Sequence, residues 1–124
     1  MPTIDEYLAD ARTQFNRVAP DELETAVQNG ALLIDIRPEK NRVEEGEIPG
    51  AIIIDRLVLE WRLAPSSDAK TIDVAPGQQV IVFCNEGYQS SLAAATLIEL
   101  GVDGATDLIG GYREWKVWVS TGEG

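Results

Sequence analysis

Three short apolar runs constrain the fold more than any other feature of the sequence. They lie in the expected strands 31–36, 51–54 and 78–84, the last of which is apolar from residue 80 on, and none alternates regularly between apolar and polar residues. A strand that is apolar on both faces is typical of a parallel sheet buried between helices, because in a sheet with one solvent-exposed face apolar and polar residues alternate along each strand. None of the runs is long enough to cross a bilayer. The sequence therefore predicts an α/β domain.

The segments between these runs carry the signals of helices. Apolar residues at helical spacing predict a helix within residues 1–15, which Thr3 or Asp5 could cap. Pro20 suits the first turn of a second helix, and Gly30 suits its end. Further helices are expected over residues 57–63, 90–101 and 112–119, a short strand over 105–111, a charged segment up to Glu47 and a loop over 64–77. This alternation predicts helices on both faces of the sheet and a binding site at the carboxyl ends of its strands.

Composition narrows the possible chemistry. The chain has 124 residues with one cysteine and no histidine. A single cysteine excludes an internal disulfide and a cysteine zinc site, and the lack of histidine removes the commonest general base, so we expect neither metal nor cofactor. A net charge of −11 disfavours nucleic acid and membranes as partners, and it disfavours small anionic substrates unless the site is locally positive. The acidic N-terminus lacks the pattern of a secretory signal, which predicts a cytoplasmic protein.

Cys84 is the residue with the clearest chemical potential. It ends the run 78–84, and a short loop separates it from the helix expected to begin at Ser90. A thiol there faces the positive end of a helix dipole and loop N–H groups that form no hydrogen bond within the helix. Both features stabilise the thiolate. Gly87 lets the loop curl so that its N–H groups turn inward. The residues alone leave a second interpretation open, in which Cys84 is a small, buried and inert residue.

Several segments of the sequence resemble the rhodanese-like family, in the same order and at similar spacing. They are LIDIRPEKNRVEEGEIPGAIII, VIVFCNEGYQSSLAAATLIELG and ATDLIGGYREW, and the resemblance extends over about residues 17–119. It implies an α/β rhodanese-like fold with a central, mostly parallel, five-stranded sheet and helices on both faces. In that interpretation residues 17–124 form the rhodanese-like domain, and residues 1–16 are an N-terminal helical extension packed on it.

The resemblance also implies sulfurtransferase chemistry at Cys84. The thiolate would take a sulfane sulfur from a small donor, hold it as a persulfide and pass it to a thiol or to cyanide, which is nucleophilic catalysis in two steps. A protein persulfide partner is an alternative donor. The residues expected to surround the bound sulfur and the substrate are those of the active-site loop: Asn85, Glu86, Gly87, Tyr88, Gln89 and Ser90.

The loop departs from the family pattern at Gln89, where related loops often carry an arginine. Glutamine brings no charge and Glu86 adds a negative one, so a dianion such as thiosulfate should bind less well. We therefore expect an organic persulfide, a thiosulfonate or a protein persulfide as the donor. Cysteine phosphatases place an arginine one position later, where this chain has Ser90, and phosphoryl transfer without that cation is not expected.

Residues outside the loop could support the site. Asp35 and Arg37 either line the same cleft or, as we favour, form a structural pair in which Asp35 accepts backbone hydrogen bonds. Arg37 or Arg42 could supply the cation that the loop lacks. Gly110 and Gly111 are expected to let the backbone approach the site closely.

Two further expectations concern the serines. Ser90 and Ser91 are expected to cap free N–H groups of the following helix, and Ser90 could also donate a hydrogen bond to the thiolate.

Two other functions stay open. One is a rhodanese-like protein-binding module with little turnover, which would bind through residues 41–47 or the N-terminal helix. The other is a redox sensor that forms a mixed disulfide at Cys84.

Overall fold

The apolar runs form a parallel sheet, as the sequence predicts. The structure is a computed structural model and describes residues 1–121. The strands lie in the order β2-β1-β3-β4, and every pair is parallel. Their bounds are Leu32–Asp35 for β1, Ile52–Ile53 for β2, Val80–Phe83 for β3 and Ala105–Asp107 for β4. The carboxyl ends of these strands therefore meet at one edge of the sheet, where Cys84 follows β3.

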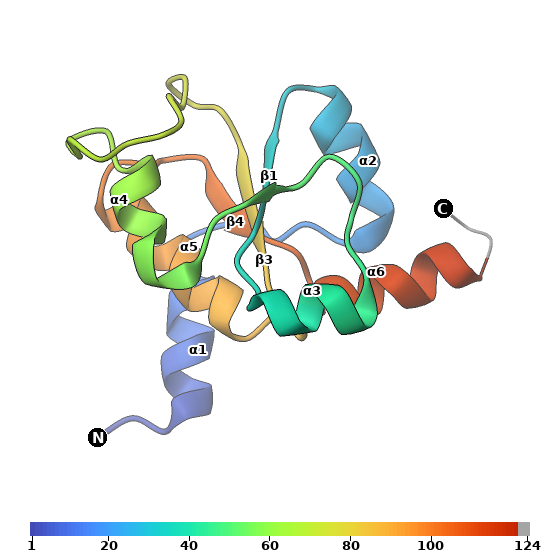
Figure 1. Ribbon diagram of the computed structural model, residues 1–124. Coiled ribbons are helices and arrows are strands. Elements are labelled where there is room, and N and C mark those ends of the chain that lie inside the picture. Colours follow the sequence, from blue (N-terminus) through green and yellow to red (C-terminus); the bar gives the residue numbers. More distant parts are fainter. Residues whose placement is uncertain (122–124) are drawn as a thin grey trace.

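Helices cover both faces of the sheet, which confirms the predicted architecture. Figure 1 shows α2 and α6 on one side of the strands and α1, α4 and α5 on the other. The helices are α1 (Ile4–Arg12), α2 (Pro20–Gln28), α3 (Glu39–Glu45), α4 (Leu59–Leu63), α5 (Gln89–Glu99) and α6 (Gly111–Ser120), with a 3-10 helix, Arg56–Val58, directly before α4. Thr3 caps α1 through a reciprocal pair of hydrogen bonds with Glu6. Pro20 opens α2 as expected.

The sheet separates two hydrophobic cores, because successive side chains of a strand point to opposite faces. On the face covered by α4 and α5, Ile34 and Val82 belong to one buried cluster. On the face covered by α2 and α6, Leu33 and Ile81 belong to the other. All four side chains are 4% exposed or less. This double burial is the reason why these strands are apolar at consecutive positions.

The expected five-stranded sheet is wrong by one strand. The described residues form four strands, and Val18 makes only an isolated parallel bridge to Leu108 at the outer edge of β4. Its N–H donates to the Asp107 carbonyl at 2.9 Å, and its carbonyl accepts from Ile109 at 2.8 Å. The pairing stops there because α2 begins at Pro20, which has no N–H to extend a ladder.

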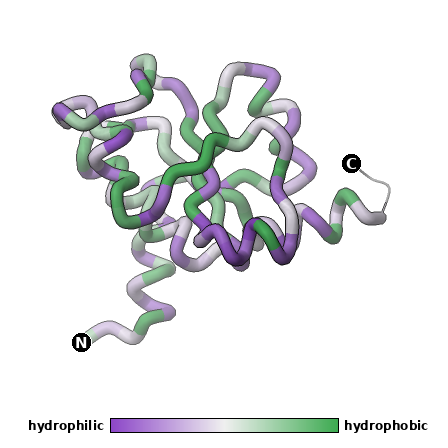
Figure 2. Tube along the Cα trace, in the orientation of Figure 1, coloured by the Kyte–Doolittle hydropathy of each residue, from purple (hydrophilic) through white to green (hydrophobic). Residues whose placement is uncertain are grey.

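Two segments of the chain differ from the sequence expectation. The run 51–54 was expected to be a buried strand, but β2 is an edge strand of two residues whose side chains, Ile52 and Ile53, are 37% and 48% exposed. The charged segment before Glu47 contains α3, which buries none of its residues. A helix without a buried face has no apolar periodicity to reveal it. Figure 2 shows α3 as mainly hydrophilic, in contrast to the hydrophobic strands.

No helix in the described part of the chain is long and apolar enough to cross a membrane.

The turn that joins β4 to α6 passes close beneath Cys84. A Cβ at Gly111 would lie 2.5 Å from the Cys84 carbonyl oxygen, and Gly111 has a φ of +67°. The N–H groups of Tyr112 and Arg113 then donate to the carbonyls of Cys84 and Asn85 at 2.8 and 3.1 Å. These hydrogen bonds attach the backbone of Cys84 and Asn85 to the first turn of α6. The short distance at Gly111 confirms the expected close approach of the two backbone segments.

We predict that Gly111→Ala lowers the free energy of unfolding by about 2–4 kcal/mol, since it combines a left-handed φ with a clash against backbone. Gly77→Ala is the matched control, because Gly77 has a φ of +76° with open space around it. The control should lose about 1–2 kcal/mol from the φ alone. Urea unfolding of both variants measures the difference, and equal losses would contradict a steric role for Gly111.

Candidate active site

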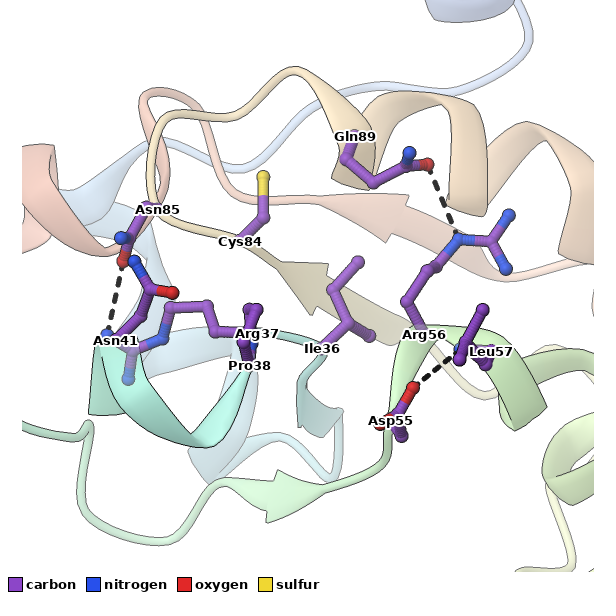
Figure 3. A pocket seen from close by; sticks show the side chains of 10 residues that line it. All are labelled: Ile36, Arg37, Pro38, Asn41, Asp55, Arg56, Leu57, Cys84, Asn85 and Gln89. Carbon is purple, nitrogen blue, oxygen red and sulfur yellow. Dashed lines mark hydrogen bonds between the residues drawn. The ribbon is translucent and has the colours of Figure 1, made fainter. Parts of the chain in front are cut away.

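Cys84 opens into a pocket at the carboxyl edge of the sheet. The cavity has a volume of about 410 Å³ and is formed by three segments that follow β1, β2 and β3 (Figure 3). The residues that line it are Ile36, Arg37, Pro38, Asn41, Asp55, Arg56, Leu57, Cys84, Asn85 and Gln89. The thiol is half-buried and is not part of a disulfide. A nucleophile in this position can be reached by a small molecule from outside the sheet.

The loop after Cys84 curls around the sulfur. The Gly87 N–H donates to Sγ at 3.2 Å, and the Cys84 thiol donates to Ser90 Oγ at 3.4 Å. Ser90 donates its one hydroxyl hydrogen to Asp107, so the expected hydrogen bond from Ser90 to the sulfur is wrong. Gly87 has a φ of +86°, and a Cβ there would lie 2.9 Å from the Gly110 nitrogen. Glycine is therefore required for this loop to close on the sulfur.

Other loop residues point away from the pocket. Tyr88 is 61% exposed and Glu86 is exposed, and neither lines the pocket in the described structure. Glu86 lies 3.4 Å from Arg113 of α6. Arg113 also bonds Glu45, and this contact holds the pKa of the Glu45 carboxyl below its usual value. The negative charge of Glu86 is thus partly balanced outside the pocket.

Two serines in the first turn of α5 bond to a buried carboxylate and do not cap the helix. Ser90 and Ser91 each lie within 2.8 Å of Oδ2 of Asp107, and the cap residue of α5, Tyr88, makes no side-chain capping bond. Arg17 completes the cluster with contacts of 2.7 and 3.1 Å to the two Asp107 oxygens. The difference from the expectation arises because Ser90 and Ser91 lie inside the first turn of α5, after its cap residue, where their hydroxyls donate to the buried carboxylate.

Two arginines hold the loop from behind. Arg12 of α1 donates to the Gly87 carbonyl at 2.8 Å and to Ser91 Oγ at 2.9 Å, and Arg17 reaches the same carbonyl at 3.2 Å. Burial and then the neighbouring charge of Arg17 lower the pKa of Arg12. Sequence analysis missed both residues, because they lie about seventy positions before the loop and no local pattern connects them to it.

Asp35 and Arg37 form the structural pair that the sequence suggested. Arg37 Nε and Nη2 contact the Asp35 oxygens at 2.8–3.2 Å, and both side chains are about 1% exposed or less. The Arg37 guanidinium also stacks 4.2 Å from the ring centre of Tyr112 and donates to Asn85 Oδ1 at 3.3 Å. Arg42 donates to the Arg37 carbonyl. Both guanidiniums are therefore held by protein acceptors.

A second arginine that lines the pocket is Arg56, which was not predicted from the sequence. Its Nε donates to Gln89 Oε1 at 3.4 Å, and its Nη1 lies 2.9 Å from both oxygens of Glu60. A signal was available, because Arg56 follows the second apolar run much as Arg37 follows the first. Residues in those positions meet at the carboxyl edge of a parallel sheet.

The arrangement suits nucleophilic chemistry at sulfur. An accessible thiol receives a backbone N–H that would stabilise its anion, and the loop around it is held by buried ion pairs. Within residues 1–121 no group of three or more metal-ligating side chains comes together.

Comparison with protein families and curated proteins gives consistent matches. A family model of the rhodanese-like domain matches residues 19–117. The chain is 32% identical over 104 residues to the thiosulfate sulfurtransferase GlpE of Pseudomonas fluorescens, covering 84% of this chain and 87% of that protein. It is 39% identical over 91 residues to the adenylyltransferase and sulfurtransferase UBA4 of Lodderomyces elongisporus, covering 68% of this chain. The match spans only 19% of that longer protein.

Solved structures share the fold. The human single-domain sulfurtransferase TSTD1 has a TM-score of 0.68 at 28% identity, with 82% of this chain and 95% of that chain covered. A protein of unknown function from Rhodopseudomonas palustris, named a possible tyrosine phosphatase, has a TM-score of 0.79 at 23% identity, with 94% and 95% covered. The second likeness concerns the fold alone.

We predict that Arg12→Ala loosens the Cys84 loop. It removes the charged donor from the Gly87 carbonyl, so the free energy of unfolding should fall by about 1–3 kcal/mol. The Gly87 amide should also exchange with solvent faster, which hydrogen exchange followed by NMR measures. Thr3→Ala is the control, because it removes the cap of α1, at about 1 kcal/mol, without touching the loop. If both variants speed Gly87 exchange equally, Arg12 acts only by stabilising α1.

Proposed function

Since the chain belongs to the rhodanese-like domain family, we propose that it transfers sulfane sulfur through a persulfide on Cys84. The chain is a sulfurtransferase of this family, in keeping with relatives of similar length such as GlpE and TSTD1. The observation that carries the assignment to Cys84 is its position at the end of β3. There the thiol opens into the pocket and accepts the Gly87 N–H.

The reaction proceeds in two displacements at sulfur. The Cys84 thiolate attacks the outer sulfur of the donor, so that a bond from Sγ to that sulfur forms and the donor's own sulfur–sulfur bond breaks. The leaving group is a thiolate for an organic persulfide and sulfite for thiosulfate. An acceptor thiolate then attacks the outer sulfur of the Cys84 persulfide, takes it and releases the Cys84 thiolate, while cyanide as acceptor yields thiocyanate. The covalent intermediate divides one transfer into two steps.

The residues around Cys84 have distinct roles in this proposal. The Gly87 N–H stabilises the thiolate and then the persulfide anion, because it is aimed at the sulfur before the reaction begins. Asn85 and Gln89 line the pocket and contact the substrate. Asp35 and Arg37 support the floor of the site and keep Asn85 in place.

The donor is proposed to be an organic persulfide, a thiosulfonate or a protein persulfide. Gln89 supplies no positive charge beside the loop, and the cavity of about 410 Å³ has the size of pockets that hold small organic molecules. A small cellular thiol or a partner protein accepts the sulfur. This chemistry needs a reduced thiol, for which the cytosol is the proposed location.

The proposal predicts a gain of one sulfur atom on Cys84. The reduced protein is incubated with thiosulfate, and separately with an organic persulfide, and its intact mass is recorded before and after cyanide. We expect the gain with the organic persulfide, its loss on adding cyanide and its absence in Cys84→Ser. Cys84→Ala should also lack the gain and keep its fold. Folded protein with a titratable thiol and no gain from either donor would favour a binding module instead.

A second prediction concerns the donor. Gln89→Arg should raise kcat/KM for thiosulfate about tenfold, because it adds a cation and its charge-assisted hydrogen bonds at the pocket. Glu86→Gln is the control, since it raises the net charge by the same amount outside the pocket, where Glu86 faces Arg113. Steady-state rates with thiosulfate and cyanide compare the two. An unchanged rate in Gln89→Arg would refute the argument that the missing cation sets the donor.

A further inference from the structure

We propose that Arg56 and Gln89 form a carboxylate-binding subsite beside Cys84. The small thiol compound that exchanges sulfur with Cys84 then carries a carboxyl group. This inference rests on the proposed sulfur transfer and names its substrate class.

Arg56 lies where it can reach a molecule bound at the sulfur. It begins the 3-10 helix that follows β2, and it lines the same cavity as Cys84. Figure 3 shows Arg56 on the opposite side of Cys84 from Asn41, with its side chain extending toward Gln89. A ligand that touches both the sulfur and this wall spans the pocket.

Arg56 has donor capacity that the protein does not use. Its Nη1 is taken by Glu60, but its Nε makes only a 3.4 Å contact with Gln89, and Nη2 has no hydrogen bond to any described residue. The other arginine of the pocket, Arg37, is held by Asp35, Asn85 and the Gly46 carbonyl. A carboxylate can therefore replace the long Gln89 contact, receive the Nε–H and accept a second bond from the Gln89 amide nitrogen.

Arg56 and Gln89 also mark the place where two cavities meet. Both residues line a second cavity of about 390 Å³ between α1 and α5, whose other lining residues include Tyr7, Thr96 and the acidic Asp10 and Glu99. A carboxylate at this junction leaves room for the rest of a substrate on either side, which suits an organic molecule better than a small inorganic anion.

The neighbouring charges favour a singly charged group at the subsite itself. Glu60 offsets part of the positive charge of Arg56, and the exposed Asp55 lies in the same pocket. A group with two charges at this one position, such as thiosulfate, would meet these carboxylates, whereas one carboxylate group matches the donors that Arg56 has free. The subsite therefore agrees with an organic persulfide rather than thiosulfate as the donor.

The experiment compares two thiol reagents that differ in one group. 2-Carboxyethyl methanethiosulfonate and 2-hydroxyethyl methanethiosulfonate each react with a thiolate to form a mixed disulfide and release methanesulfinate. Because Cys84 is the one cysteine of the chain, intact mass after a timed quench gives the rate at that residue. The measured quantity is the ratio of the two rate constants in the wild-type protein, Arg56→Gln, Glu60→Gln and Arg113→Gln.

Arg56→Gln should lower this ratio by about tenfold, as expected for loss of a charge-assisted hydrogen bond. Glu60→Gln should raise the ratio by releasing Nη1. Arg113→Gln, with the same change of net charge but outside the pocket, should change the ratio by less than about twofold. An unaltered ratio in Arg56→Gln, or an equal fall in Arg56→Gln and Arg113→Gln, would overturn the subsite. Circular dichroism and the Tm establish that each variant is folded.

A second measurement separates the subsite from the proposed activity. Sulfur loading of Cys84 is followed with the persulfides of 3-mercaptopropionate and 2-mercaptoethanol, and Arg56→Gln should slow the first about tenfold and leave the second nearly unchanged. If neither persulfide loads the wild-type protein while the methanethiosulfonate ratio still depends on Arg56, the subsite stands and sulfur transfer is refuted. If both persulfides load but Arg56→Gln affects them equally, transfer stands and the subsite is refuted.

Discussion

The buried carboxylate of Asp107 connects the elements that surround Cys84. Asp107 is the last residue of β4, and its carboxylate accepts hydrogen bonds from Ser90, Ser91 and Arg17 at distances between 2.7 and 3.1 Å. Burial of a carboxylate without partners would destabilise the fold by several kcal/mol, so these contacts are required wherever Asp107 lies inside. They tie the first turn of α5 to the sheet. The position of the sulfur loop follows from this attachment.

The loop is held from two sides, and the thiol lies between them. Behind it, Arg12 and Arg17 bind the Gly87 carbonyl, while Gly87 offers its N–H to the sulfur. In front, the Asp35–Arg37 pair contacts the side chain of Asn85. A donor that is aimed at the sulfur before a charge develops stabilises that charge without reorganisation, and this rigidity is what a persulfide anion needs.

The distribution of arginines resolves a conflict between the net charge and the chemistry. A chain with a charge of −11 repels anions, yet a persulfide and its donors are anionic. Five of the ten basic residues gather around the loop and its pocket, namely Arg12, Arg17, Arg37, Arg56 and Arg113. Most of them are bound to carboxylates or carbonyls, so they position the backbone more than they attract ligands. Arg56 differs because it lines the pocket and its Nη2 makes no hydrogen bond to the described residues.

Local patterns in the sequence determined much of this protein. Continuous apolar runs specify buried parallel strands, and the step from β3 to Cys84 and then to a helix places the thiol at the carboxyl edge of the sheet. These features are predictable because residues close in sequence produce them. The exposure of β2 and the polar helix α3 were not predictable, since the first depends on which strand lies at the edge and the second has no buried face. Only the tertiary structure decided that Arg12 and Arg56 meet the loop, because side chains separated by tens of residues become neighbours only when the sheet and its helices have packed.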